Sequence, residues 1–427
     1  MSDLHTTETK VTRAWVLHPD IRTDSQRRRP DHALAEAVSL AVALPDLEVT
    51  GHDVVRLPKA HPGMLFGTGK IEELKALFKA QEIDLVLIDG PVSPVQQRNL
   101  ERAWKVKLLD RTGLILEIFS DRAATREGVL QVEMAHLSYQ RTRLVRAWTH
   151  LERQRGGLGF VGGPGETQIE ADRRAIDDQL GRLRRQLSKV VKTRTLHRAA
   201  RAKVPYPVVA LVGYTNAGKS TLFNRLTGAE VMAKDMLFAT LDPTMRAVTL
   251  PDGTDVILSD TVGFISDLPT ELVAAFRATL EEVTGADLIL HVRDISHPET
   301  EEQAKDVEDI LGSLGIAEGV PMLEVWNKSD QLDAEALETR ENQASRDEAI
   351  HLASALTGQG MAALLADIPP RITAPKLEEV LELTHADGRR RAWLYEQGVV
   401  LGEEQGQDGS ELRVEWTATQ QARFAKL

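Results

Sequence analysis

The chain has 427 residues, 42% hydrophobic and 27% charged, which is the composition of a globular protein with room for two to four domains. It has no cysteine, and its 12 histidines lack paired zinc-binding spacings, so we expect neither disulfide nor zinc chemistry. No apolar run approaches the roughly 20 residues of a membrane-spanning helix, and the polar residues 1–10 do not resemble a secretion signal, so we expect a cytoplasmic protein without membrane insertion.

Charge is distributed unevenly along the chain. The formal net charge is −12, which would repel nucleic acid from the molecule as a whole. The segment from Arg141 to Lys203 nevertheless contains 16 Lys or Arg against 6 Asp or Glu, a local charge of +10. This segment is therefore a candidate phosphate-binding surface, and the alternative is an ordinary solvated helix face.

Residues 1–120 are expected to form a small α/β subdomain. Short apolar runs alternate with helical patterns, which is typical of a mostly parallel sheet. The expected strands are 14–17, 49–57 and 83–88, and the expected helices are 33–43 and 70–80. Gly67 to Lys70 resembles a phosphate loop but lacks its full glycine spacing, so we interpret it as a turn at the start of a helix.

Residues 121–203 carry two stripes of apolar residues with a seven-residue repeat. The members of the first stripe are Leu130, Met134, Leu137, Leu144, Trp148 and Leu151, and those of the second are Ile169, Ile176, Leu180, Leu183, Leu187 and Val190. The glycine-rich run from Gly156 to Gly165 joins them. The pattern predicts an antiparallel helical hairpin with arms of roughly 45 to 50 Å and this loop at its tip, and the alternative for the loop is a flexible linker.

Two prolines in the run from Lys203 to Pro207 indicate a boundary, followed by alternating strands and helices over residues 204–372. Pro369 and Pro370 indicate the end of this third domain. Residues 373–427 are expected to form a small α+β unit, with periodic segments at 380–384, 391–395 and 412–416 and turns at Asp387-Gly388 and Asp408-Gly409.

A phosphate loop of the form G-x-x-x-x-G-K-S follows the predicted strand Val208 to Val212. Its backbone N–H groups and the following helix N-terminus would converge on phosphates, Lys219 would supply a positive charge, and the Ser220 hydroxyl would bind Mg²⁺. We expect the helix to open at Thr221. The loop residues expected to bind nucleotide are Gly213, Tyr214, Thr215, Asn216, Ala217, Gly218, Lys219, Ser220 and Thr221.

Asp260, Thr261, Val262 and Gly263 follow the predicted strand Val256 to Ser259. At this strand end the Asp260 carboxylate can hold the metal through water, and the Gly263 N–H can contact a γ-phosphate. Between this motif and the phosphate loop, residues Phe238, Ala239, Thr240, Leu241 and Asp242 are expected to close over the nucleotide. We predict that Thr240 binds the metal together with Ser220. The alternatives are Thr244 as the metal ligand, or two ordinary loop threonines.

The base-binding motif Asn327, Lys328, Ser329 and Asp330 follows the predicted strand Met322 to Trp326. The Asp330 carboxylate can accept two hydrogen bonds from guanine, and adenine would leave this buried carboxylate unpaired, which selects GTP over ATP. Ser354, Ala355 and Leu356 can offer backbone N–H groups to the guanine oxygen. Because all these motifs stand at strand ends of one doubly wound sheet, they predict a GTP-binding domain. The residues expected to act in hydrolysis are Lys219, Thr240, Asp260 and Gly263.

The sequence resembles the HflX family of ribosome-associated GTPases over nearly its whole length. The residues that carry the resemblance are Gly156–Gly159, Gly163–Glu170, Asp172–Arg174, Phe238–Thr244 and Asp260–Phe264. The resemblance implies Mg²⁺-dependent GTP hydrolysis, binding to ribosomal RNA of the large subunit through the N-terminal region, and dissociation of stalled or stressed ribosomes. No DNA is expected as a partner. The alternatives are a ribosome-assembly GTPase of the Obg-like kind and a GTP-gated RNA-binding module whose hydrolysis is incidental.

Two further residues bear on the rate of hydrolysis. Phe264 stands where many GTPases place the glutamine that positions the attacking water, which predicts slow intrinsic hydrolysis raised by the ribosome. Asn216 resembles the loop asparagine of GTPases activated by potassium, in which the side-chain oxygen helps to hold K⁺ beside the phosphates. The resemblance therefore adds K⁺ as a second candidate cofactor.

Overall fold

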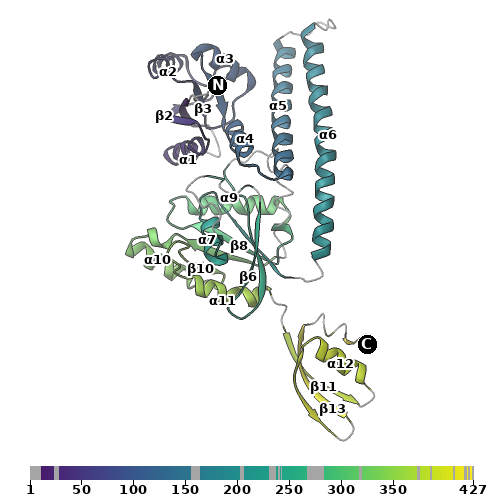
Figure 1. Ribbon diagram of the computed structural model, residues 1–427. Helices are drawn as coiled ribbons and strands as arrows, with labels where there is room; N and C mark the ends of the chain where they lie inside the picture. Colours follow the sequence, from purple (N-terminus) through teal and green to yellow (C-terminus); the bar gives the residue numbers. More distant parts are fainter. Residues whose placement is uncertain are drawn as a thin grey trace, which may run out of the picture.

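The computed structural model describes residues 11–23, 28–154, 164–201, 206–229, 237, 238, 241, 243–266, 283–316, 320–372, 376–384, 387–406, 409–417, 421, 424 and 425. Within these residues the chain forms three β-sheets with helices packed around them, and a long helical hairpin (Figure 1). This confirms the predicted α/β class. None of the described helices is both long and apolar enough to cross a membrane.

The N-terminal sheet is fully parallel, with the strand order β2-β1-β3-β4. The strands are β1 (Thr12–Ile21), β2 (Leu47–Leu57), β3 (Leu85–Ile88) and β4 (Lys107–Asp110), and the helices are α1 (Pro30–Val42), α2 (Thr68–Ala80), α3 (Pro94–Trp104) and α4 (Arg111–Arg122). Gly67 is the N-cap of α2, which confirms the predicted turn at a helix start. All five expected elements are present, and α3, β4 and α4 are additional.

The hairpin consists of α5 (Arg126–Gln154) and α6 (Pro164–Arg201), which lie side by side (Figure 1). Arg141 of α5 pairs with Asp177 of α6 at 2.9 Å. At about 1.5 Å per residue, the 38 residues of α6 span roughly 57 Å, longer than the expected arm. Proline has no N–H to lose in the first helical turn, so Pro164 begins α6 rather than ending the loop.

Three residues of the predicted stripes are buried, namely Leu130, Leu180 and Leu183. The other stripe residues whose side chains are described are half-buried. The side chains of residues 144–169 and the whole of 155–163 lie outside the described residues, and with them most of the glycine-rich run. The middle of α5 is anchored on β4, because Asp110 accepts hydrogen bonds from Tyr139 at 2.6 Å and Arg143 at 2.9 Å.

The central sheet has the order β10-β9-β8-β5-β7-β6, in which only β6 is antiparallel to its neighbour. The strands are β5 (Val208–Gly213), β6 (Thr244–Thr249), β7 (Asp255–Asp260), β8 (Leu288–Asp294), β9 (Met322–Asn327) and β10 (Ile350–Leu352). The described helices are α7 (Lys219–Thr227), α9 (Thr300–Ser313), α10 (Ala334–Ala344) and α11 (Met361–Ile372). This is the doubly wound, mostly parallel sheet that the motifs predicted.

The C-terminal unit contains β11 (Lys376–Thr384), α12 (Gly388–Glu396), β12 (Val400–Gln405) and β13 (Gly409–Thr417), in an antiparallel sheet with the order β11-β13-β12. It has a separate core around Leu412, Val414 and Trp416. Pro369 and Pro370 lie inside α11, not after it. Each proline lacks the N–H that would donate to the carbonyl four residues earlier, and buried Ile368 keeps this last turn packed on the sheet.

One apolar core extends from the N-terminal sheet into the central sheet. It contains Val16 of β1 and Leu40 of α1 together with Val212 of β5 and Val262, which follows β7. Phe119 of α4 packs edge-to-face on Phe238, with ring centroids 4.6 Å apart. The N-terminal subdomain therefore packs directly against the loop that was predicted to close over the nucleotide.

Candidate nucleotide-binding site

The phosphate loop connects β5 to α7, which begins at Lys219 with Gly218 as its N-cap, two residues earlier than expected. Two glycines are required by the backbone. Gly213 has φ +153°, and a Cβ there would lie 2.1 Å from the carbonyl oxygen of Val292. Gly218 has φ +93°, and a Cβ would lie 2.2 Å from Nδ2 of Asn327. Larger residues would therefore push the loop away from the sheet.

Lys219 is buried beneath the loop. Its Nζ donates hydrogen bonds to the carbonyl oxygens of Gly213 at 3.0 Å and Tyr214 at 2.8 Å. Burial lowers the pKa of Lys219 to about 8, with Asp260 opposing the shift. A phosphate beside this amine would favour its charged form, so anion binding and protonation of Lys219 reinforce each other.

Ser220 and Asp260 meet next to the loop. The Ser220 hydroxyl donates to Oδ2 of Asp260 at 2.8 Å, and Asp260 is the buried last residue of β7. Hydroxyl and carboxylate oxygens are the ligands that Mg²⁺ prefers, so this pair fits the metal that P-loop GTPases generally use. Thr240, Ala239 and Asp242 lie outside the described residues. Thr244, the alternative metal ligand, pairs with Asp260 in the register of β6 and β7.

The segment after Asp260 is joined to the phosphate loop through the backbone. The N–H of Thr215 donates to the carbonyl oxygen of Phe264 at 2.7 Å, and the N–H of Phe264 donates to that of Gly213 at 3.1 Å. A Cβ on Gly263 would lie 2.8 Å from Cγ2 of Thr215 and 3.1 Å from Nζ of Lys219. Gly263 thus brings its backbone against the buried lysine, as the expected contact with a γ-phosphate requires.

Asn327 connects the two halves of the site. Its Nδ2 donates to the carbonyl oxygen of Ala217 at 2.8 Å, and its Oδ1 accepts from the N–H of Ala355 at 2.9 Å. Arg225 of α7 also donates to the carbonyl oxygen of Ala355, at 3.0 Å. Asn327 therefore supports both loops, and Arg225 is a supporting residue that no sequence motif indicated.

The Asp330 carboxylate accepts a hydrogen bond from the hydroxyl of Ser354, at 2.5 Å, and is exposed. The expectation of a buried carboxylate was wrong for the protein alone, because only the base itself would cover it. Lys328 has a left-handed backbone and forms an ion pair with Asp294 at 2.7 Å. Asp294 is a second supporting residue that no sequence motif indicated. Ser329 is buried in the short 3-10 helix η1 (Ser329–Gln331), and Leu356 is 69% exposed.

The phosphate loop, Asp260, Asn327 and Ser354 all lie at the carboxyl ends of parallel strands, at one edge of the central sheet. This fold and this constellation define a P-loop GTPase. The residues predicted to bind the phosphates and those predicted to bind the base are brought together through Asn327. Thr221 directly follows Ser220, and Thr261 directly follows Asp260. Thr261 donates its hydroxyl to the carbonyl oxygen of Leu211 at 2.6 Å and is buried, so it supports the sheet.

Comparison with known proteins also indicates a GTPase and shows the family to which the chain belongs. Family models match residues 31–120 (GTP-binding GTPase N-terminal), 122–201 (GTP-binding GTPase Middle Region), 208–328 (50S ribosome-binding GTPase) and 339–426 (HflX C-terminal domain). GTPase HflX of Magnetococcus marinus is 47% identical over 97% of this chain and 94% of its own. GTPase HflX of Escherichia coli K12 is 45% identical over 82% of each chain. The chain belongs to the HflX family of GTPases.

The crystal structure of SsGBP in complex with GDP is similar with a TM-score of 0.47 and 23% identity, over 84% of this chain and 98% of that one.

Proposed function

We propose that guanine nucleotide binds with its phosphates in the loop from Gly213 to Ser220 and its base against Asp330. Lys219 and the Gly263 N–H would contact the terminal phosphates, and Ser220 and Thr240 would hold Mg²⁺, which neutralises phosphate charge when bound. The Ser220–Asp260 hydrogen bond and the approach of Gly263 to Lys219 support this arrangement. Asn216 is exposed in this loop, and its side-chain oxygen would contact K⁺.

Hydrolysis by the isolated protein is expected to be slow. Phe264 is 1% exposed and part of the apolar core, so its ring cannot orient a water molecule. A further partner must supply this function or order the loops around the γ-phosphate. We assign that partner as the large ribosomal subunit.

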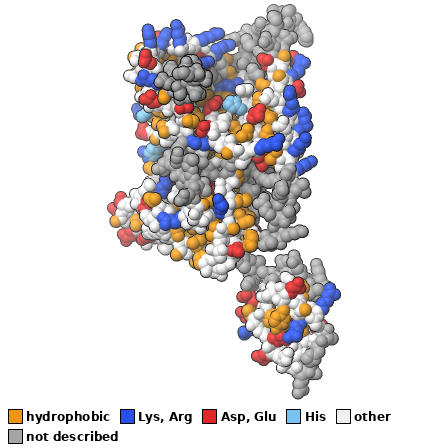
Figure 2. All heavy atoms as spheres, viewed as in Figure 1, with side chains coloured by type: hydrophobic (Ala, Val, Ile, Leu, Met, Phe, Trp, Pro, Cys, Tyr) orange, Lys and Arg blue, Asp and Glu red, His pale blue; other side chains and the backbone are white. Residues whose placement is uncertain are grey.

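The observation that supports this assignment is the basic outer face of α6. Figure 2 shows Lys and Arg side chains along the outer edge of the hairpin. The exposed arginines of α6 include Arg173, Arg174, Arg182, Arg184 and Arg185. They stand out against an acidic protein and match the charge of RNA phosphates. The family description "50S ribosome-binding GTPase" for residues 208–328 agrees with this partner.

We further propose that the hairpin converts GTP binding into dissociation of stalled ribosomes in the cytoplasm. A helix of roughly 57 Å beside a GTPase domain can transmit a rearrangement of its loops to a distant tip. Replacing residues 156–163 by a Ser-Gly linker of equal length should preserve folding and GTP binding but abolish subunit splitting. Light scattering of intact ribosomes with a non-hydrolysable GTP analogue measures this.

Light scattering and gradient fractionation together separate ribosome splitting from the two alternatives, an assembly GTPase and a GTP-gated RNA-binding module. Undiminished splitting by the linker variant would contradict a role for the tip. Binding only to precursor particles in gradient fractionation would indicate an assembly GTPase. Ribosome binding that is the same with every nucleotide and causes no splitting would contradict the proposed action.

A further inference from the structure

The side chain of Tyr214, in the phosphate loop, leaves the nucleotide site and meets the N-terminal subdomain. Its hydroxyl donates to Oε2 of Glu36 in α1 at 2.9 Å. The hydroxyl oxygen of Tyr214 also accepts from the N–H of Ser266 at 2.8 Å and is within hydrogen-bond distance of the Ser266 hydroxyl. Ser266 lies three residues beyond Gly263. Tyr214 thus connects the phosphate loop, the segment that carries Gly263, and a carboxylate from another subdomain.

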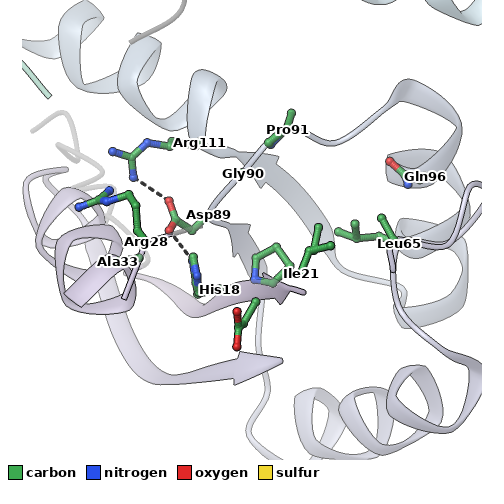
Figure 3. A pocket seen from close by; sticks show the side chains of 13 residues that line it. His18, Ile21, Arg28, Ala33, Leu65, Asp89, Gly90, Pro91, Gln96 and Arg111 are labelled. Atoms are coloured by element: carbon green, nitrogen blue, oxygen red, sulfur yellow. Dashed lines mark hydrogen bonds and ion pairs between the residues drawn. The ribbon is translucent and has the colours of Figure 1, made fainter. Parts of the chain in front are cut away.

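Arg111 makes the second connection. Its guanidinium donates to the carbonyl oxygen of Ser266 at 3.0 Å and is also paired with Glu36. Arg111 also donates a hydrogen bond to Oδ1 of Asp89 at 2.7 Å, and Oδ2 of Asp89 lies 2.7 Å from Nδ1 of His18 (Figure 3). These residues border a cavity of about 240 Å³ at the carboxyl ends of β1 and β3. The side chain of Arg111 is 6% exposed and that of Glu36 is 11% exposed.

The charges in this cluster are fixed by their surroundings. Burial raises the pKa of Glu36, but Arg111 and Arg28 outweigh this effect and the net pKa is lowered, so Glu36 is an ionised acceptor. Burial and the negative charge of Glu36 raise the pKa of Tyr214, so its hydroxyl keeps its proton and donates it. Charge-assisted hydrogen bonds of this kind are the stronger and better-oriented ones in proteins.

We propose that Glu36 and Arg111 are positioning residues for GTP hydrolysis, and that they act through Tyr214 and Ser266. Together they hold the segment after Gly263 at a fixed distance from the phosphate loop. This matters for GTP more than for GDP, because Gly263 has a γ-phosphate to contact only in the GTP complex. The proposal concerns the GTPase reaction and is independent of the ribosomal partner.

The test uses the full-length variants Tyr214→Phe, Glu36→Gln and their combination. Single-turnover hydrolysis should slow by about tenfold in Tyr214→Phe, since one oriented hydrogen bond is lost. The affinity for a non-hydrolysable GTP analogue should fall relative to that for GDP. The double variant should be slowed by less than the product of the two single effects, because both substitutions break the Tyr214–Glu36 hydrogen bond.

Tyr139→Phe is the matched control. It also removes a tyrosine hydroxyl that donates to a carboxylate, Asp110, but in the middle of α5. A purely structural role would lower the melting temperature in both tyrosine variants and leave the ratio of GTP-analogue to GDP affinity unchanged. Unchanged or faster hydrolysis in Tyr214→Phe, or additive effects in the double variant, would overturn the proposal. Should Tyr214→Phe fail to fold, Ser266→Ala serves in its place, with the same outcomes deciding.

Discussion

Asp330 and Asn327 belong to one short motif but have different surroundings. Asn327 is buried and hydrogen-bonded to the backbone of both neighbouring loops, so it is committed to supporting the site. Asp330 is exposed and has Ser354 as its hydrogen-bond donor. We therefore propose that Asp330, and not Asn327, contacts the base.

Asp330→Asn should weaken GTP binding and improve binding of xanthosine triphosphate. Asparagine replaces an acceptor for two guanine donors by a group that can accept only one, at a cost of about 2 kcal/mol or roughly 30-fold in affinity. Calorimetry with GTP, ATP and XTP measures the change. Asp333→Asn is the control, because Asp333 caps α10 and asparagine is an equally good N-cap. Unaltered GTP affinity in Asp330→Asn would rule out this base pocket.

Asn216 allows a second test at the residue scale. It is exposed and has φ +60°, a left-handed conformation that glycine adopts without strain. Asn216→Gly should therefore keep the loop geometry while removing the side-chain oxygen proposed to hold K⁺. Wild-type GTP turnover should be several-fold faster in K⁺ than in Na⁺, and the variant should lose this difference. Equal wild-type rates in the two salts would leave Asn216 without a role in cation binding.

Most of the nucleotide site could be predicted at this scale, because each motif is a few consecutive residues at a strand end. The supporting contacts could not. Glu36 and Tyr214 are 178 residues apart, and a lone glutamate in an amphipathic helix gives no signal of a partner in another subdomain. Asp330 shows a different error, since its motif was recognisable but its exposure in the protein alone was not predicted.

At the scale of elements, α6 carries its buried apolar side chains and its exposed basic side chains on different faces. Leu180 and Leu183 are buried, whereas Arg182, Arg184 and Arg185 are exposed. The heptad pattern predicted this division because the helical period fixes which side chains share a face. It did not predict the length of α6, since the end of a helix depends on local capping and contacts beyond the repeat.

Replacing Arg182, Arg184 and Arg185 by glutamine should weaken binding to the large subunit and reduce its salt dependence. Glutamine keeps helix propensity but releases no counterions from RNA. The negative slope of log affinity against log salt should therefore become shallower by about 2. The comparison is a variant with Lys79, Arg98 and Arg102 replaced by glutamine, which removes three exposed charges from the N-terminal helices instead. Equal losses in the two variants would point to net charge rather than the α6 face.

At the scale of the whole molecule, slow intrinsic hydrolysis should be stimulated by the ribosome. With no polar side chain at position 264, we expect large ribosomal subunits to raise turnover at least about tenfold. Phosphate release with and without purified subunits measures this, and the α6 triple variant should lose most of the stimulation. Rapid turnover by the protein alone would contradict the role assigned to Phe264.

The arrangement of the subdomains was less predictable than the subdomains themselves. Periodicity and proline-marked boundaries indicated four segments because these signals are local. The packing of Phe119 on Phe238 depends on two apolar residues that sequence analysis cannot pair, since any buried aromatic would satisfy the same pattern.

The continuous core between the first two sheets means that the chain is modular in sequence but not in folding. A fragment beginning near residue 204 would leave Tyr214, Phe238 and Phe264 without the helices α1 and α4 that stand over this side of the domain. Its newly exposed apolar surface would favour aggregation, and its loops would lack their neighbours. Kinetic constants measured on such a fragment would therefore differ from those of the full-length protein. A graft of an unrelated P-loop domain onto this N-terminal half would likewise fail unless the aromatic side chains were matched.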